Sequence, residues 1–431
     1  MARLLRSLQR VLGLGASGVP AAPAAVSRSR SIDTDFTIFR EGDRAVLHTK
    51  NPSLTKPLKH GGKTNLRRGH LEHSRIIGSR VWDAVQAHKG PDTRLSLPTL
   101  DEYVTLTPRY VTPIYPHDAN LIVSLLDIHV NPPVSGDKQP PLEILESGTG
   151  HGSLTLHLAR ALHAANTIPP PRPSQSQIQY VSNRNRNPKE QESPEREHEG
   201  TADAEAQREW DAWRTERGAV IHTVDVSSKF AKLAEQNVQG FRRGIYGGTV
   251  DFYVGAVEEW INEQVARRAA KRPVEPFLTC AILDMPSAHE RIPLVKDIIK
   301  RDGRLVVFAP SITQIGDCVR TIHEMDRAFV MERVVELGTG VSGGRNWDVR
   351  LAVKKSASDP STWNATESEE TRDADPEEAS EAEDTNEISS AMDAPSRAVD
   401  ENAVMVCRPK VGLRTLGGGF VGVWRRIEDS R

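Results

Sequence analysis

Three alternating glycines, Gly148, Gly150 and Gly152, constrain the fold of this chain more than any other feature of its sequence. The run Leu142–Leu145 before them predicts a short buried strand, and Leu154–Ala165 after them predicts a helix. Glycine lets a backbone turn tightly and approach a ligand closely. Strand, glycine turn and helix in this order are typical of an open α/β sheet that binds a nucleotide-like ligand. The triplet alone also fits a plain tight loop or an NAD site.

The alternation of strand-like and helix-like segments continues beyond the turn. Further strands are expected at Ala219–Val224, Val250–Val254, Leu278–Leu283, Arg304–Phe308, Phe329–Leu337, Val404–Cys407 and Phe420–Trp424. Helical periodicity is present at His117–Ile128 and Ser228–Val238, and Ser227 or Ser228 could cap the second of these helices. The pattern predicts an α/β fold with a mainly parallel, doubly wound, Rossmann-like sheet.

Composition divides the chain into three parts. Residues 1–35 form a leader, residues 36–108 a small β-rich domain and residues 109–431 the α/β domain. Alternating runs broken by Gly, Pro and Asn, such as Arg44–His48 and Tyr103–Leu106, indicate the β-rich unit. Within the α/β domain, residues 169–217 and 356–402 hold few apolar side chains, so we expect two disordered insertions.

Charge is distributed unevenly along the chain. Residues 366–402 hold 14 acidic side chains against two arginines, a formal charge of -12, so the remainder carries about +10 within a total of -2. A basic remainder favours a polyanionic partner such as RNA, although a soluble enzyme with an acidic segment is an alternative. The three cysteines are widely spaced, which argues against a disulfide framework and a zinc site and favours a reducing compartment. No run of 18 apolar residues occurs.

The leader has the composition of a mitochondrial transit peptide. It contains five arginines and no acidic residue before Asp33, namely Arg3, Arg6, Arg10, Arg28 and Arg30. On a helix, the apolar residues between Leu4 and Leu12 cluster on one side, as in amphipathic presequences. The alternative is an ordinary disordered basic tail.

Three carboxylates follow predicted strands. Glu146 comes just before the glycine turn, where it could bind the ammonium group of a methionine and would disfavour a pyrophosphate, so it favours S-adenosylmethionine as the ligand. Asp225 ends the next strand, where a carboxylate accepts hydrogen bonds from ribose hydroxyls or caps a helix. Asp284 ends a central strand and faces the ligand crevice, unless it is capped or salt-bridged. Ala256 and Val257 could line an adenine, although such residues are more often part of a core.

Four motifs in a fixed order carry a family resemblance. They are Glu146-Ser147-Gly148-Thr149-Gly150-His151-Gly152-Ser153-Leu154-Thr155, the upstream Thr112-Pro113-Ile114-Tyr115-Pro116-His117-Asp118, Leu283-Asp284-Met285-Pro286, and Phe308-Ala309-Pro310-Ser311-Ile312-Thr313-Gln314. The chain resembles the catalytic subunits of the tRNA adenine-58 N1-methyltransferases. The resemblance covers about residues 36–165, 219–354 and 404–426, and it implies a class I S-adenosylmethionine-dependent methyltransferase domain behind a small N-terminal β domain.

The resemblance also implies roles for individual residues. The expected cofactor-binding residues are Glu146, Gly148, Gly150, His151, Gly152, Ser153, Asp225, Ala256, Val257 and Asp284. Asp225 stands where the family more often has Glu, and Ala256 stands at a commonly acidic position. Asp284 would be the catalytic carboxylate and Tyr115 a neighbour of the target base, with no metal. Ala288-His289 replaces the family's Pro-Trp, and Gly417-Gly418 replaces a His-Thr pair.

The implied reaction transfers a methyl group from S-adenosylmethionine to N1 of adenosine 58 in the T-loop of tRNA. Because N1 lies on the pairing edge, the base must turn out into a pocket. Asp284 could then accept a hydrogen bond from the exocyclic amine and stabilise the developing positive charge. The alternatives are a noncatalytic RNA-binding subunit and a methyltransferase of another RNA or of protein.

The resemblance and the leader together imply an assembly and a location. The family forms tetramers, so we expect a homotetramer, or a heterotetramer with a noncatalytic tRNA-binding subunit. The arginine-rich leader favours the mitochondrial matrix and the homomeric form, and a nuclear location is the alternative.

Overall fold

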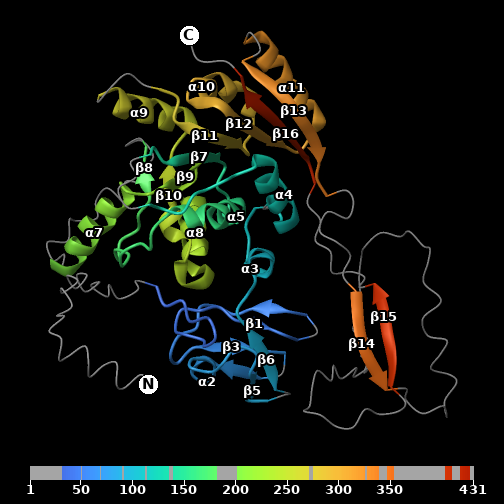
Figure 1. Cartoon of the computed structure of the whole chain (residues 1–431). Helices are drawn as coiled ribbons and strands as arrows, with labels where there is room; N and C mark the ends of the chain where they lie inside the picture. The colour runs from blue at the N-terminus through green and yellow to red at the C-terminus, as the bar shows by residue number, and fades with distance from the viewer. Residues whose placement is uncertain are drawn as a thin grey trace, which may run out of the picture.

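The computed structural model describes residues 32–49, 51–67, 69–89, 92–111, 114–134, 139–181, 201–270, 275–325, 328–338, 347–353, 403–409 and 418–427. Most of these residues belong to a large domain built on one sheet and a small domain beside it (Figure 1). No described helix combines the length and the apolar composition that crossing a membrane requires. The leader before residue 32 and the acidic segment at 356–402 lie outside the described residues.

The central sheet has eight strands in the order β13-β16-β12-β11-β7-β9-β10-β8. Every pair from β8 to β12 is parallel, whereas β16 pairs antiparallel with both β12 and β13. The strands are β7 (Leu142–Ser147), β8 (Gln179–Tyr180), β9 (Ala219–Asp225), β10 (Val250–Val254), β11 (Leu278–Leu283), β12 (Ile299–Ala309), β13 (Phe329–Glu336) and β16 (Phe420–Arg426). The prediction of a mainly parallel, Rossmann-like α/β sheet is confirmed.

Helices cover both faces of this sheet (Figure 1). One layer consists of α4 (Pro116–Leu126), α5 (Ser153–Leu162) and α8 (Ser228–Gly240), and the other of α9 (Val257–Ala269), α10 (Ile292–Lys296) and α11 (Ile312–Glu324). Neighbouring β7 residues Ile144 and Leu145 belong to different core clusters, one on each face. A strand buried on both faces carries apolar side chains on both, as Ile144 and Leu145 do, whereas the buried Glu143 is satisfied by ion pairs with His222 and Arg268.

The small domain is β-rich, as predicted. Its elements are β1 (Val46–Leu47), β2 (Ser53–Leu54), β3 (Lys63–Asn65), β4 (His70–Glu72), α2 (His73–Ile76), β5 (Ala84–Val85) and β6 (Thr93–Ser96). Four strands form the sheet β2-β1-β6-β5, and β3 pairs with β4. A core of its own, which includes Phe39, Leu58 and Leu95, holds these short strands together.

The assignment of Tyr103–Leu106 to the β-rich unit is wrong, because these residues lie in helix α3 (Leu100–Leu106). Thr99 and Glu102 form a reciprocal capping box at its start, which satisfies backbone donors that the first turn would leave free. The hydroxyl of Tyr103 donates to the carbonyl of Asn237 over 3.0 Å and ties α3 to α8.

The predicted disordered insertion at 169–217 is also wrong for its described part. Residues 201–214 form helix α7 (Thr201–Arg214), and β8 adds a strand to the sheet beside β10. Arg214 and Arg217 pair with the buried Asp251 at 3.0 and 2.7 Å, and Trp210 is buried. These anchors fold the segment onto the domain. Residues 182–200 lie outside the described residues.

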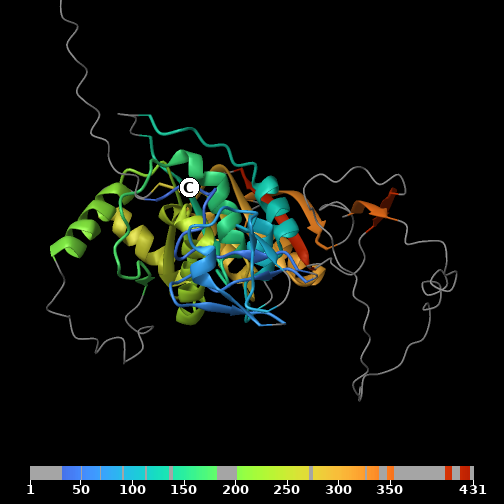
Figure 2. The ribbon, with the colours of Figure 1, turned by 90° about the horizontal axis from the view of Figure 1, so that it is seen from below.

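The segment predicted as a returning strand at Val404–Cys407 lies in β15 (Ala403–Pro409), which pairs with β14 (Trp347–Val353) rather than with the central sheet. The two strands form an antiparallel ribbon apart from the body of the molecule (Figures 1 and 2). The second predicted returning strand, at Phe420–Trp424, is in the central sheet as β16.

Candidate functional site

The glycine turn sits over the ends of two neighbouring strands. Gly148, Gly150 and Gly152 have φ angles of 100°, 53° and 78°, in the left-handed region that favours glycine. The amide of Gly148 donates to Val224 over 3.0 Å, and the amide of Asp284 donates to Ser147 over 2.8 Å. A Cβ atom on residue 148 would overlap the carbonyl oxygen of Asp284. Glycine at 148 therefore lets the turn approach β11.

Glu146 lies at the end of β7 and is only 1% exposed. The hydroxyl of Thr155, in α5, donates to its carboxyl group over 2.6 Å. Burial raises the pKa of Glu146 to about 7, and the nearby Asp284 and Asp225 act in the same direction. The carboxyl group is thus held in place but lacks a positive partner among the described residues.

Asp225 joins the glycine turn to the next loop. Its carboxyl oxygens accept hydrogen bonds from the amides of Gly150 at 3.1 Å and Ser227 at 2.8 Å. Burial raises its pKa despite these donors. The N-cap of α8 is Ser227, whose side chain accepts a hydrogen bond from the amide of Phe230. Asp225 therefore does not cap this helix, and its carboxyl group orients the glycine turn instead.

Asp284 follows β11 directly and lies beside the turn. Leu283 pairs with Ser147, which brings the ends of β11 and β7 together. Burial and the charge of Asp225 raise the pKa of Asp284 to about 7. Within the described part of the chain, its carboxyl group has neither a hydrogen bond nor an ion pair, so the salt-bridged alternative finds no support. Three carboxyl groups thus converge at one edge of the sheet.

The residues at this edge fit S-adenosylmethionine. The three carboxyl groups have no ion pair within the described residues, and such a site favours a cationic ligand that neutralises it. Glu146 would hold the ammonium group, Asp225 the ribose hydroxyls and the glycine turn would allow close approach. Ala256 precedes α9 at the same edge and is half-buried, in a position to line the adenine.

Val257 and Ser153 differ from the other predicted cofactor residues. Val257 is almost fully buried and packs in the core under α9, which favours a structural role for its side chain. The hydroxyl of Ser153 donates to the carbonyl of Ile114, so this side chain fastens α5 to the segment before α4. Its backbone amide at the start of α5 is the group that remains for a ligand.

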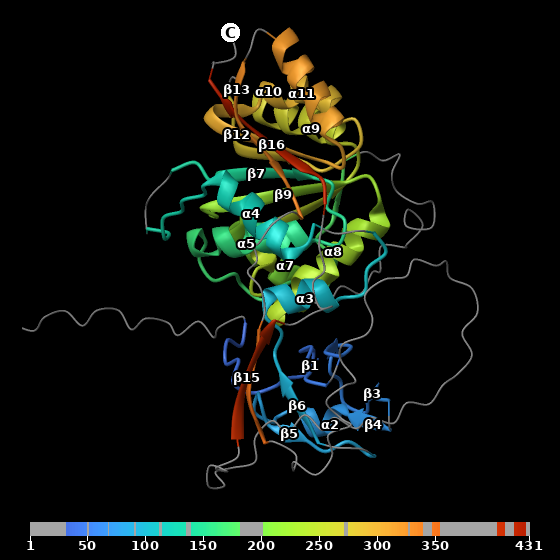
Figure 3. The ribbon, with the colours of Figure 1, turned by 90° about the vertical axis from the view of Figure 1, so that its right-hand side faces the viewer.

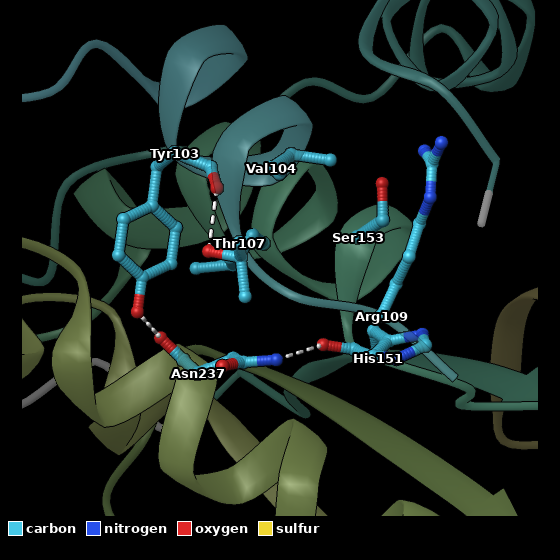
Figure 4. Close-up of a pocket in the computed structure, with 8 residues that line it drawn as sticks. Tyr103, Val104, Thr107, Arg109, His151, Ser153 and Asn237 are labelled. Carbon is cyan, nitrogen blue, oxygen red and sulfur yellow. Dashed lines mark hydrogen bonds between the residues drawn. The ribbon is translucent and has the colours of Figure 1, made fainter. Parts of the chain in front are cut away.

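His151 lines a pocket behind the turn, together with Tyr103, Val104, Thr107, Arg109, Ser153, Leu156 and Asn237 (Figure 4). Its Nε2 accepts from the amide of Tyr110 over 2.7 Å, which places the ring proton on Nδ1. Nδ1 is buried and has no hydrogen-bond partner in the described structure. Burial and Arg109 lower the pKa of His151, which keeps its ring neutral. The side chain is therefore a neutral donor that faces the pocket.

Tyr115 is the N-cap residue of α4 and is 8% exposed. The guanidinium of Arg109 lies over its ring, 5.1 Å from the centroid. The predicted neighbour of the target base is thus near the glycine turn but covered by Arg109. A base can contact the Tyr115 ring only if the Arg109 guanidinium moves away or stacks together with the base.

Two exposed side chains at the site were not predicted. Val226 follows Asp225 and is 73% exposed, so its apolar side chain is available for contact with an adenine ring. Tyr110 is also exposed, and the ammonium group of Lys229 lies 4.4 Å from its ring centroid. The sequence feature that could have identified Val226 is its position directly after Asp225, the carboxylate that ends β9.

The two departures from the family pattern lie in turns at the same edge. Ser287, at a φ of 53°, leads into a short 3-10 turn at Ala288–Arg291, in which Ala288 is buried and His289 is half-buried. Gly419 has a φ of 113° and accepts from the amide of Leu337 over 2.8 Å. Gly418 is described and Gly417 lies outside the described residues.

The chain is similar in sequence to several known proteins, among them two tRNA methyltransferases. The chain is 26% identical over 295 residues to the tRNA (adenine(58)-N(1))-methyltransferase TrmI of Thermus thermophilus, covering 68% of this chain and 83% of the relative. It is 27% identical over 127 residues to the tRNA (adenine(58)-N(1))-methyltransferase catalytic subunit TRM61 of Candida albicans, covering 29% of this chain and 35% of that protein. No protein-family model matches the sequence. The resemblance inferred from the four motifs is confirmed.

Among solved structures, a SAM-dependent O-methyltransferase from Thermotoga maritima matches with a TM-score of 0.50 at 13% identity, over 92% of this chain and 97% of that one. This likeness establishes the fold and carries no information on the methyl acceptor. The large domain therefore has the fold of the class I methyltransferases.

Proposed function

We propose that this chain is an S-adenosylmethionine-dependent tRNA (adenine-58-N1)-methyltransferase, which transfers a methyl group to N1 of adenosine 58 in tRNA. The observation that carries the proposal is the convergence of Glu146, Asp225 and Asp284 around the glycine turn, without a positive partner in the described structure. The two relatives described above are tRNA (adenine(58)-N(1))-methyltransferases, and one of them is a catalytic subunit. A noncatalytic subunit would have no need for this arrangement.

Asp284 is the residue that would contact the methyl acceptor, the adenine base. An adenine turned out of the T-loop can present its exocyclic amine to this carboxylate, which accepts the hydrogen bond and fixes the direction of N1. Positive charge develops on the base as N1 is methylated, and a fixed carboxylate stabilises that charge. Bound S-adenosylmethionine supplies the electrophilic methyl group. Because the hydrogen bond needs the ionised carboxylate, kcat/KM should rise with pH through the pKa of Asp284 in the free protein, about 7.

Single-turnover methylation of unmodified tRNA tests this role. We expect Asp284→Asn to slow the methylation step by at least about a hundredfold, the scale of losing one preorganised electrostatic contact. Asp297→Asn, at an exposed carboxylate after α10, should behave as wild type and serves as the matched control. An undiminished rate in Asp284→Asn would remove Asp284 from the mechanism.

The small domain is part of the proposed RNA-binding surface. Residues 36–108 contain twelve Lys and Arg side chains against seven Asp and Glu, a formal charge of +5. Such a surface attracts a phosphate backbone and makes binding dependent on salt. Its independent core supports its role as a separate module that contacts tRNA outside the catalytic crevice.

The proposed assembly is a homotetramer, with a heterotetramer as the alternative outcome. Within the described residues, β13 has a hydrogen-bonded neighbour on one side only, and Val330, Met331 and Val334 are exposed along it. An exposed apolar edge strand is a surface that proteins cover by pairing with another chain. Native mass spectrometry of the purified chain measures the state, and a monomer that gains activity only with a second, unlike chain would support the alternative.

The proposed location is the mitochondrial matrix. The support is the leader composition, with its arginines and absence of acidic residues before Asp33. Residues 1–35 fused to a fluorescent reporter should direct it to mitochondria, whereas a nuclear signal from the full chain would favour the alternative.

A further inference from the structure

Trp82 in the small domain combines exposure with an unusual backbone. Its side chain is 54% exposed, and its φ of 73° lies in the left-handed region. A bulky residue adopts this conformation only where the surrounding structure imposes it, and such residues cluster at ligand-binding positions. Among the described residues of 36–108, no other large apolar side chain is exposed to this degree.

The structure around Trp82 holds its ring at the surface. The amide of Trp82 donates to Leu95 over 2.6 Å, and a guanidinium nitrogen of Arg94 donates to the carbonyl of Trp82 over 3.1 Å. The ring of His48 stacks on the indole at a centroid distance of 4.6 Å and an angle of 23°. His48 is fixed in turn by a 2.7 Å hydrogen bond with Ser96. The indole is thus a preorganised aromatic surface with one supporting ring.

The surroundings of this surface are charged rather than apolar, with a positive balance. Arg80, two residues before Trp82, and Asp83, directly after it, are both exposed, and Arg94 binds the carbonyl of Trp82. The whole small domain carries a formal charge of +5. Protein partners favour contiguous apolar patches, which a single exposed indole does not provide. Unpaired bases stack on single aromatic rings in basic surroundings, with little dependence on their sequence.

We propose that Trp82, supported by His48, is a stacking platform for an unpaired base of the RNA substrate, outside the catalytic crevice. The inference rests on the proposed function, since it assigns a second contact with the same RNA. Trp82 lies two residues before β5, which is at the end of the small domain remote from the central sheet (Figures 1 and 3). The platform therefore contributes to holding the RNA and leaves the methylation step to the residues around Asp284.

The test compares three substitutions at one position. Trp82→Ala and Trp82→Gly should each weaken tRNA binding roughly tenfold, the scale of one base–aromatic stack, while Trp82→Phe retains most of the affinity. Trp82→Gly should melt at a higher temperature than Trp82→Ala, because glycine adopts a positive φ without strain. Ile168→Ala removes another exposed apolar side chain, in the large domain, and should bind tRNA as wild type.

Affinity is measured by fluorescence anisotropy with labelled unmodified tRNA at low and high salt. The rate of methylation is measured separately, at saturating tRNA. The tenfold loss should persist at high salt, since stacking releases no counterions, and the saturated rate should equal that of wild type. Unchanged affinity in Trp82→Ala, or a loss that disappears at high salt, would overturn the platform. A change in oligomeric mass in Trp82→Ala would identify a protein contact instead and would also overturn it. If wild type itself does not methylate tRNA, the proposed function fails, which is a separate result.

Discussion

At the scale of single residues, Asp284 is held in a state that suits its proposed reaction and destabilises the empty fold. Its pKa is raised to about 7 by burial and by Asp225, and that of Glu146 is raised to about 7 in the same site. A carboxyl group whose pKa is higher in the folded than in the unfolded chain stabilises the fold most at low pH, and this contribution is lost as the pH rises through 7. Function and stability therefore make opposite demands on this residue.

Asp284→Asn should accordingly stabilise the protein without its ligand while removing activity. The free energy of unfolding is expected to rise by about 2 kcal/mol at pH 8. This value is about half of the full electrostatic cost implied by the raised pKa, because the half-buried carboxyl group keeps some contact with water. At pH 5 the gain should shrink, since the wild-type carboxyl is then mostly protonated. Thermal melting between pH 5 and pH 8 measures both. An equal or lower melting temperature of Asp284→Asn at pH 8 would contradict the pKa assignment.

Sequence patterns predicted Glu146, Asp225 and Asp284 because each ends a strand, and parallel strands meet at one edge. They could not predict that Arg109 covers Tyr115 or that the Ser153 hydroxyl is bound to Ile114. Those contacts depend on side-chain directions in a loop before α4, and no periodicity encodes them.

At the scale of elements, strands with a regular apolar pattern could be predicted, whereas a helix marked only by its N-terminal capping box was missed. The strands Val250–Val254 and Leu278–Leu283 were predicted with the bounds that the structure shows. Helix α3 was missed although Thr99 and Glu102 form a capping box, since its short apolar run looked like an alternating strand. Helix α7 was missed because its polar composition hides Trp210, and because its anchor Asp251 lies about forty residues later.

The strand–turn–helix unit provides a direct test of the turn. Gly148→Ala should prevent tight binding of S-adenosylmethionine and destabilise the fold by at least about 2 kcal/mol, since the added methyl group meets backbone and φ is positive. Gly316→Ala, in the interior of α11 with open space around it, should be neutral or stabilising by about 0.5–1 kcal/mol. Isothermal titration calorimetry and thermal melting measure the two effects. Wild-type cofactor affinity in Gly148→Ala would argue against a close approach at this turn.

At the scale of the whole molecule, two neighbouring arginines of the large domain reach the small domain. Arg242 donates to the carbonyl of Pro98 over 3.2 Å, and Arg243 makes the more extensive contact. Arg243 of the large domain donates two hydrogen bonds to the buried carboxylate of Asp43, at 2.9 and 2.8 Å. It donates three more to the backbone carbonyls of Asp33, Asp35 and Ile38. Its own φ is 58°, so the backbone is strained to reach this position. The contact spans 200 residues of sequence, which is why no local pattern could predict it.

Arg243→Ala should leave the charge of Asp43 buried without its partner and cost about 3–5 kcal/mol. We expect easier proteolytic separation of the small domain and weaker tRNA binding, with unchanged affinity for S-adenosylmethionine. Arg320→Ala, at an exposed arginine in α11, is the control and should change neither the proteolysis of the small domain nor tRNA binding. Unaltered proteolysis and stability in Arg243→Ala would show that other contacts dock the domains.

The position of the methyl group in the RNA product decides whether the chain is a tRNA (adenine-58-N1)-methyltransferase. The purified chain is incubated alone with S-adenosylmethionine and an unmodified tRNA transcript, and the product is mapped by nuclease digestion and mass spectrometry, with an adenosine-58-to-guanosine transcript in parallel. N1-methyladenosine is expected at position 58 in the first transcript, and no methylation is expected in the second. Methylation at another position, or equal methylation of both transcripts, would contradict this assignment.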